Sequence, residues 1–254
     1  MHRLRLVSTA LAVGALSFGI AACGDDDEDS GSSGGGGEET LDLTIGSLLP
    51  LTGDLQDFGG SGEKASNVAI EQINAAIEEA GVDHTVTLQV EDDQTTEEGG
   101  ISGAQALAQN DASCIAGSYA SGVTIPTAES VTIDEEILQI SPAATSDEIT
   151  GLDDDGFLNR TAPPDSFQGP TLADFMEEEL GGAEGLVVNV GARNDPYGTG
   201  LADTFSAAWE AKGGEIGSET IYDPEAATYD SEAGDIVAGN PDAIVIIDFP
   251  ETYA

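Results

Sequence analysis

The stretch Ala243-Ile244-Val245-Ile246-Ile247 is apolar at every position and is only five residues long. A short, continuous apolar run rich in β-branched residues is typical of a strand in a parallel sheet that is covered on both faces. Parallel strands need crossover connections, which are usually helices. The stretch therefore predicts an α/β protein, and the rest of the chain should show helices that alternate with such strands.

Strand-like and helix-like patterns do alternate from residue 41 onward. In the segment 61–80, apolar residues recur at helical spacing, and Gly81 is a natural helix end. The predicted strands are 41–51, 84–90, 114–119, 137–140, 157–162, 185–190, 215–222 and 243–247. The predicted helices are 61–80, 103–109, 124–136, 167–180, 200–212 and 231–237. This alternation is the signature of parallel sheets flanked by helices.

A proline-containing break, Ala162-Pro163-Pro164-Asp165, divides this pattern into two units. We predict a first lobe over 41–162 and a second lobe over 163–254, and the first is of ordinary domain size. The sequence ends just after a predicted strand, where the next helix should begin. We therefore expect the second lobe to be C-terminally incomplete in this sequence.

The N-terminal segment has the features of a secretory signal. Residues 1–22 consist of a short basic head, an apolar middle and small residues at the end. The segment Ile20-Ala21-Ala22-Cys23 resembles a bacterial lipobox, which implies lipid on Cys23 and attachment to the outer face of a membrane. An ordinary signal peptide that contains a cysteine is the alternative. Residues 23–40 are acidic, Ser and Gly residues, which predict a disordered, flexible tether.

The chain is strongly acidic, with 49 Asp and Glu against six Lys and Arg and a formal net charge of −43. Such a charge argues against nucleic acid or anionic lipid as a partner, because both repel it. It does not identify a ligand, since solubility or adaptation to high salt would explain it equally well.

The residue inventory also argues against catalysis. Beyond the signal segment the only histidine is His84, at a predicted strand start and away from the turns that follow strands. A Ser-His-Asp arrangement is therefore not expected. No His/Cys cluster has the spacing of metal ligands, and no Gly-rich loop has the Lys-Ser/Thr sequel of a phosphate site. We predict a protein that is not an enzyme and has neither a cofactor nor a metal.

Five short motifs, in order, resemble the branched-chain amino-acid-binding (leucine-binding) family, the type I periplasmic solute-binding proteins of ABC importers. They are IGSLLPLTG (45–53), GSYAS (117–121), ISPAATS (140–146), SFQGP (166–170) and YGTGL (197–201). The resemblance covers essentially all of 41–254. It implies two α/β lobes, each a parallel sheet flanked by helices, that close on a ligand in the cleft between them.

The same resemblance implies the site residues of the first lobe. The serine that matches Ser121 binds the ligand α-carboxylate, and the turn between strand and helix at this point adds free N–H groups. The residues that match Ala143 and Thr145 hold the ligand ammonium and carboxylate, and small residues here, Ala144 included, let the ligand approach the backbone. The alternatives are a helix cap for Ser121 and a simple turn for 141–145.

Three further residues complete the predicted site. Tyr197 matches a tyrosine of the second lobe that closes over the ligand, although Tyr often packs half exposed on a surface. Phe58 stands where relatives often carry Trp and would form an apolar wall, or would belong to the core. Asp248 follows a strand where relatives tend to show an aromatic residue. Its carboxylate would pair with a ligand ammonium, shift specificity toward polar or cationic ligands, or simply be an exposed charge.

The resemblance implies an extracytoplasmic, lipid-anchored protein that captures an amino acid, preferably a branched-chain one, and delivers it to an ABC permease. Other relatives bind amides, urea or aromatic acids. The alternative is a lipoprotein that senses an amide or polar amino acid and reports to a membrane receptor. The sequence does not separate transport from sensing.

Overall fold

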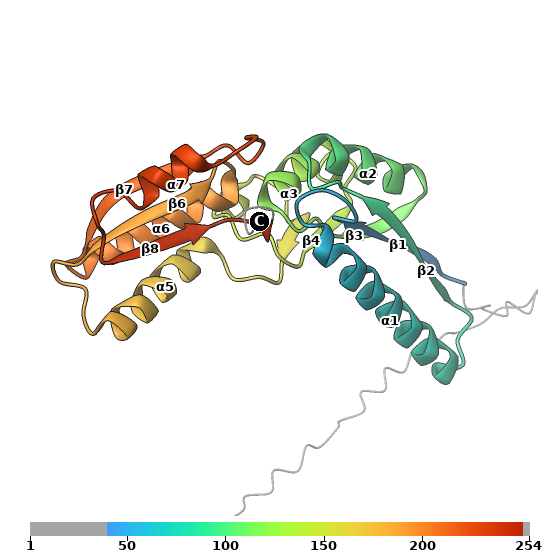
Figure 1. Ribbon diagram of the computed structural model, residues 1–254. Helices are drawn as coiled ribbons and strands as arrows, with labels where there is room; N and C mark the ends of the chain where they lie inside the picture. Colours follow the sequence, from blue (N-terminus) through green and yellow to red (C-terminus); the bar gives the residue numbers. More distant parts are fainter. Residues whose placement is uncertain (1–39, 251–254) are drawn as a thin grey trace, which may run out of the picture. The chain divides into compact units, whose positions relative to one another are not determined.

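The computed structural model describes residues 40–250 (Figure 1). The signal peptide predicted for 1–22, the lipidation of Cys23 and nearly all of the predicted tether lie outside the described residues, as do residues 251–254. Among the helices that are described, none combines the length and the apolar character needed to cross a membrane.

The first sheet has five parallel strands in the order β2-β1-β3-β4-β5. The strands are β1 (Asp42–Leu49), β2 (Thr85–Asp92), β3 (Ala112–Ala116), β4 (Leu138–Ser141) and β5 (Leu158–Arg160). They are connected by α1 (Gln56–Ala80), α2 (Glu97–Gln109), α3 (Ser121–Thr127) and α4 (Glu148–Gly151). The core beneath α2 is formed by buried aliphatic side chains that include Leu48, Leu107 and Ile115. As predicted, α1 ends at Gly81, whose φ of 69° is left-handed.

The second sheet has three parallel strands in the order β7-β6-β8. The strands are β6 (Val187–Arg193), β7 (Glu215–Tyr222) and β8 (Ala243–Ile247). The helices are α5 (Asp165–Leu180), α6 (Pro196–Ala211) and α7 (Asp230–Ile236), and α5 and α6 pack together. Trp209 and Phe205 of α6 are fully buried and lie at the centre of the core of this sheet.

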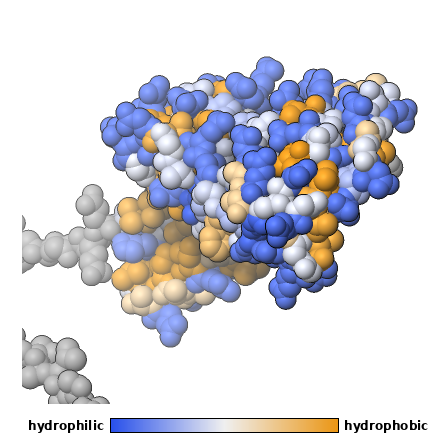
Figure 2. Space-filling model, turned by 90° about the vertical axis from the view of Figure 1, so that its left-hand side faces the viewer, coloured by the Kyte–Doolittle hydropathy of each residue, from blue (hydrophilic) through white to orange (hydrophobic). Residues whose placement is uncertain are grey.

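The predicted fold class, an α/β protein with parallel sheets flanked by helices, is confirmed. The expectation that β8 is covered on both faces is wrong for the described residues. Val245 and Ile247 are buried, whereas Ile244 and Ile246 on the opposite face are 40% and 50% exposed. Much of the face seen in Figure 2 is hydrophilic, as the acidic composition predicts, with hydrophobic residues gathered in smaller areas.

The remaining differences from the predicted elements have local causes. The helix predicted over 124–136 is in fact α3, followed by a π-helical turn, η1 (Ala128–Thr132), in which Ile133 N–H donates to the carbonyl of Ala128. Pro126 lies within α3 and cannot donate a main-chain hydrogen bond, so the regular pattern is already interrupted there. The helix α4 is too short to show any apolar period and was not predicted.

Candidate functional site

A cavity of about 330 Å³ lies at the carboxyl ends of the strands of the first sheet. Its lining residues follow β1, β3, β4 and β8 or come from the first turns of helices: Leu55, Phe58, Tyr119, Ala120, Ser121, Ala143, Thr145, Gln168, Tyr197 and Phe249. Five of the seven predicted ligand-binding residues, Phe58, Ser121, Ala143, Thr145 and Tyr197, line this one cavity. The carboxyl ends of parallel strands are where open α/β sheets bind ligands.

The Ser121 hydroxyl is the most constrained polar group of the cavity. Ser121 is only 2% exposed, and its Oγ accepts hydrogen bonds from the backbone N–H groups of Thr145 (3.1 Å) and Ser146 (3.2 Å). A hydroxyl has two lone pairs and one proton, so the proton alone is left for a further partner. Ser121 can therefore act only as a donor toward the cavity, which suits a carboxylate oxygen.

The predicted alternative for Ser121, a helix cap, does not describe its hydrogen bonds. The N-cap of α3 is Ala120, which has no side-chain cap, and Ser121 is the first helical residue. Its hydroxyl instead fastens the loop after β4 to the start of α3.

That loop is fixed from a second side by Ser141 at the end of β4. The Ser141 hydroxyl donates to the carbonyl oxygen of Ser118 (2.5 Å) and accepts from the N–H of Ala144 (3.0 Å). Ala143 lines the cavity, and its small side chain leaves room near the backbone. Ala144 does not line the cavity: it is 1% exposed and packs in a core cluster with Ile125 and Leu158. Its side chain therefore has a packing role.

The aromatic wall of the cavity comes from segments far apart in the sequence. Tyr197, in the first turn of α6, stacks on Phe249 with ring centroids 5.6 Å apart and planes at 17°. Phe58, in the first turn of α1, lines the cavity and is 45% exposed, so it is not a core residue. Phe249 was not predicted as a site residue.

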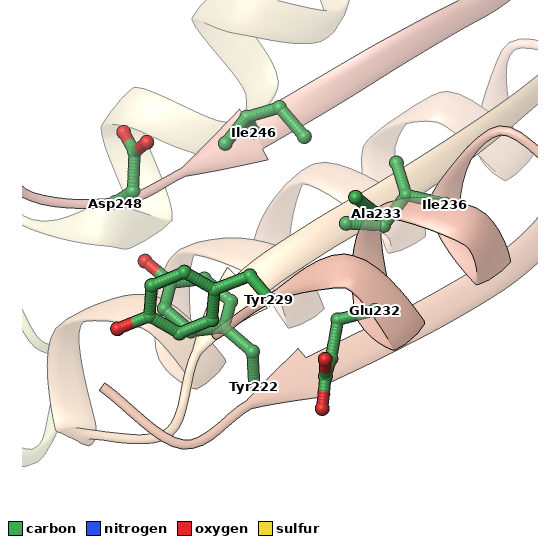
Figure 3. A pocket seen from close by; sticks show the side chains of 7 residues that line it. All are labelled: Tyr222, Tyr229, Glu232, Ala233, Ile236, Ile246 and Asp248. Carbon is green, nitrogen blue, oxygen red and sulfur yellow. The ribbon is translucent and has the colours of Figure 1, made fainter. Parts of the chain in front are cut away.

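Asp248 is not brought together with the other predicted residues. It lines a separate cavity of about 530 Å³ beside α7, together with Tyr222, Tyr229 and Glu232. Figure 3 shows its carboxylate just beyond the end of β8, near Ile246. Phe249, the next residue, lines the smaller cavity, whereas Asp248 lines only the larger one. The smaller cavity is the candidate site, because the constrained hydroxyl of Ser121 and the loop after β4 converge there.

Two buried carboxyl groups lie close to this site. Burial raises the pKa of Asp165 to about 6, although the Thr145 hydroxyl opposes the shift. Burial likewise raises the pKa of Asp93 to about 6, against a hydrogen bond from the N–H of Thr95. The negative charge of Asp93 adds to burial in raising the pKa of Tyr119. No cluster of metal-ligating side chains is present within residues 40–250.

Relatives of known sequence match most of the chain. Leu/Ile/Val-binding protein homolog 3 of Brucella melitensis is 32% identical over 184 residues, which is 72% of this chain and 47% of the relative. Leu/Ile/Val-binding protein BraC3 of Rhizobium johnstonii is 29% identical and matches 68% of this chain and 45% of its own length. The chain thus spans about half the length of the curated relatives it matches.

Solved structures have the same fold. A leucine binding protein of Thermotoga maritima superposes with a TM-score of 0.66 at 24% identity, over 80% of this chain and 55% of that one. An ABC transporter substrate-binding protein of Desulfitobacterium hafniense, solved in complex with Leu, superposes with a TM-score of 0.58 at 25% identity, over 81% of this chain and 58% of that one. The model of the periplasmic binding protein family matches residues 42–254, and the chain belongs to this family of binding proteins.

Proposed function

We propose that this protein is an extracytoplasmic solute-binding protein that captures an amino acid with an aliphatic side chain and delivers it to an ABC permease. The observation that carries the proposal is the convergence of Ser121, Ala143, Thr145, Tyr197 and Phe58 on one cavity. Its polar side holds a hydroxyl restricted to donation, which suits a carboxylate, and its other side is aromatic. The names of the relatives support the ligand class.

We further propose that the protein is exported, anchored by lipid and divided into two lobes. A signal peptide over 1–22 would direct export, lipid on Cys23 would hold the protein at the outer face of a membrane, and the tether up to residue 40 would leave the two lobes free to close. We propose lobes over 41–162 and 163–254, with Tyr197 and Phe249 of the second lobe closing over a ligand held at Ser121.

A ligand screen tests this function directly. The Cys23→Ser protein, which lacks the lipid, is melted in the presence of single L-amino acids, amides and aromatic acids. A ligand at 100 times its Kd should raise the free energy of unfolding by about 2.7 kcal/mol. We expect Leu, Ile or Val to raise the melting temperature. If only amides or aromatic acids raise the melting temperature, the ligand belongs to that class and is not an aliphatic amino acid. If the protein is folded and none of the compounds stabilises it, the proposal is wrong.

Single substitutions test the site itself. Ser121→Ala should weaken amino-acid binding by about 1–3 kcal/mol, because the ligand carboxylate then lacks its hydroxyl donor. Tyr197→Ala should weaken it by a similar amount, because the aromatic wall loses the ring that stacks on Phe249. The matched control is Ser166→Ala, whose hydroxyl donates to Asp147 (2.8 Å) on the exposed surface. Isothermal titration calorimetry gives the Kd of wild type and of each variant. A Ser121→Ala protein that binds with wild-type affinity would show that Ser121 is not part of the site.

A further inference from the structure

Asp165 is a fully buried carboxylate beside the candidate site, and it was not predicted from the sequence. It is the first residue of α5, and it is 0% exposed. Its backbone N–H donates to the carbonyl oxygen of Thr145 (2.9 Å), so the two residues are held next to each other. Isolated buried carboxylates are costly, and such a group therefore calls for an explanation.

The carboxylate faces two polar side chains that line the cavity. The side-chain amide of Gln168 donates from Nε2 to Asp165 Oδ1 (3.3 Å). The Thr145 hydroxyl lies beside the same carboxylate and lowers its pKa, although Thr145 Oγ1 and Asp165 Oδ2 do not yet form a hydrogen bond of ordinary geometry. Both atoms are buried, and neither has another hydrogen-bond partner among the described residues, so each is available to the other. Helix α6 lies close to Asp165 Oδ2, since a Cβ added to Gly200 of that helix would lie 3.2 Å from this oxygen.

A carboxylate accepts hydrogen bonds and cannot donate them, so it decides the direction of its neighbours' hydrogen bonds. When the Thr145 hydroxyl and one N–H of the Gln168 amide donate to Asp165, Thr145 keeps only its lone pairs for the cavity. Gln168 keeps its carbonyl oxygen and its second N–H. Ser121, whose lone pairs are filled, faces the same cavity as a donor.

We propose that Asp165 is a positioning residue that makes Thr145 a hydrogen-bond acceptor, so that the cavity selects ligands with a cationic N–H donor opposite the Ser121 donor. This inference rests on the proposed amino-acid ligand and adds to it: Asp165 sets the preference for an amino group over the keto group of the corresponding 2-oxo acid. The residue acts through Thr145 and does not line the cavity.

The sharpest test compares L-leucine with its 2-oxo analogue, 4-methyl-2-oxopentanoate, in wild type and Asp165→Asn. The Asn side chain is of nearly the same size but has one acceptor oxygen and one donating amide nitrogen. With its oxygen held by Gln168 Nε2, as Asp165 Oδ1 is now, its amide nitrogen faces Thr145, which then accepts and turns its own proton toward the cavity. We expect the ratio of leucine affinity to oxo-acid affinity to fall by about tenfold or more, because a hydrogen bond to a charged group is lost. The readout is the pair of Kd values from calorimetry.

The matched control is Asp147→Asn. The negative charge of Asp147 acts on Asp165 and raises the pKa of Asp165. The carboxylate of Asp147 itself, however, accepts a hydrogen bond from Ser166 (2.8 Å). Asp147→Asn therefore removes the same charge without changing the hydrogen bonds of Thr145 or Gln168, and it should leave the affinity ratio unchanged. A Thr145→Val background should remove most of the effect of Asp165→Asn, since the two residues act as a unit.

The pH dependence of binding provides a readout that does not depend on a variant. Protonated Asp165 becomes a donor like Asn, so leucine binding should weaken as the pH falls from 7 to 5, through the pKa of about 6. The charged groups that act on Asp165 are Asp147, Arg160 and Asp195. The pKa of Asp93 is also raised to about 6. The fall in leucine affinity between pH 7 and pH 5 must therefore persist in Asp93→Asn and disappear in Asp165→Asn.

The outcomes separate this inference from the proposed function. If wild type binds leucine but the affinity ratio is unchanged in Asp165→Asn, the inference fails and the proposed function stands. If Asp165→Asn does not fold, leucine binding by wild type that is equal at pH 7 and pH 5 still overturns the inference. If wild type binds no amino acid, both fail together.

Discussion

Replacing Arg193 with methionine should destabilise the protein by about 3–5 kcal/mol, because it breaks a buried ion-pair network. Arg193 is 4% exposed at the end of β6, and its Nε lies 2.5 Å from Asp195 Oδ2. Its Nη2 lies 3.3 Å from Asp54 Oδ2, and its guanidinium lies 3.6 Å from the centre of the Phe249 ring. Without the cation, the carboxylate of Asp195 loses a partner in a site that is largely shielded from water.

The consequences of this loss extend to the candidate site. Asp195 also caps α6, since its Oδ1 accepts from the N–H of Gly198 (2.7 Å), and Tyr197 lies in that same first turn. Asp54 belongs to the loop between β1 and α1, so Arg193 links the two sheets next to the cavity. A weaker leucine affinity in Arg193→Met is expected to accompany the loss of stability.

Urea unfolding followed by circular dichroism measures the change in stability. The control is Lys212→Met. The ammonium group of Lys212, which follows α6, pairs at the surface with two carboxylates of α5, Asp174 (2.5 Å) and Glu177 (2.7 Å), and the substitution removes both ion pairs. Exposed ion pairs contribute little, so the urea midpoint of this variant should stay at the wild-type value. Equal midpoints for the two variants would mean that the Arg193 network is no more important than a surface pair.

The sequence predicted the sheets well because their signals are local. Strands such as 215–222 and 243–247 match the structure residue for residue, since short apolar or alternating runs bounded by turn residues identify strands directly. The site residues came from the family resemblance. The positions of Ser121 and Thr145, soon after strands β3 and β4, agree with it, because parallel strands bring their carboxyl ends to one edge.

The parts of the site that were missed depend on orientation, which a single sequence does not contain. Asp248 and Phe249 both follow β8, and only the exit direction of the chain decides that Phe249 lines the cavity. Ala144 stands between two cavity residues but points into a core cluster. Asp165 carried no signal among 49 acidic residues, because its burial results from the packing of α5 against α6 and Thr145.

The second large effect concerns the core of the second sheet, where Trp209→Ala should cost about 3–5 kcal/mol in unfolding free energy. Trp209 is fully buried near the C-terminal end of α6 and stacks on Phe205 with centroids 6.3 Å apart. The Gly213-Gly214 turn packs against the indole so closely that a Cβ at Gly214 would collide with it. Such a turn has little freedom to collapse into the space left by the ring, so the cavity should remain.

The chemistry of the indole makes this a test of packing alone. Trp209 Nε1 is buried without a hydrogen-bond partner, so its removal breaks no hydrogen bond. Trp209→Phe, which deletes the unpaired N–H and only part of the volume, should therefore lose much less stability than Trp209→Ala. The surface control is Phe175→Ala on α5, where the ring is 60% exposed.

Circular dichroism must follow this unfolding, because Trp209 is the only tryptophan in the sequence and its fluorescence disappears with it. A loss in Trp209→Ala no greater than that in Phe175→Ala would show that the second sheet does not depend on this side chain. Leucine affinity provides the final distinction. Tyr197 and Trp209 lie at opposite ends of α6, so a helix that stays rigid should hold Tyr197 in place and leave the Kd of the folded variant close to that of wild type. A Kd that rises together with the loss of stability would mean that the core of the second sheet positions the aromatic wall of the cavity.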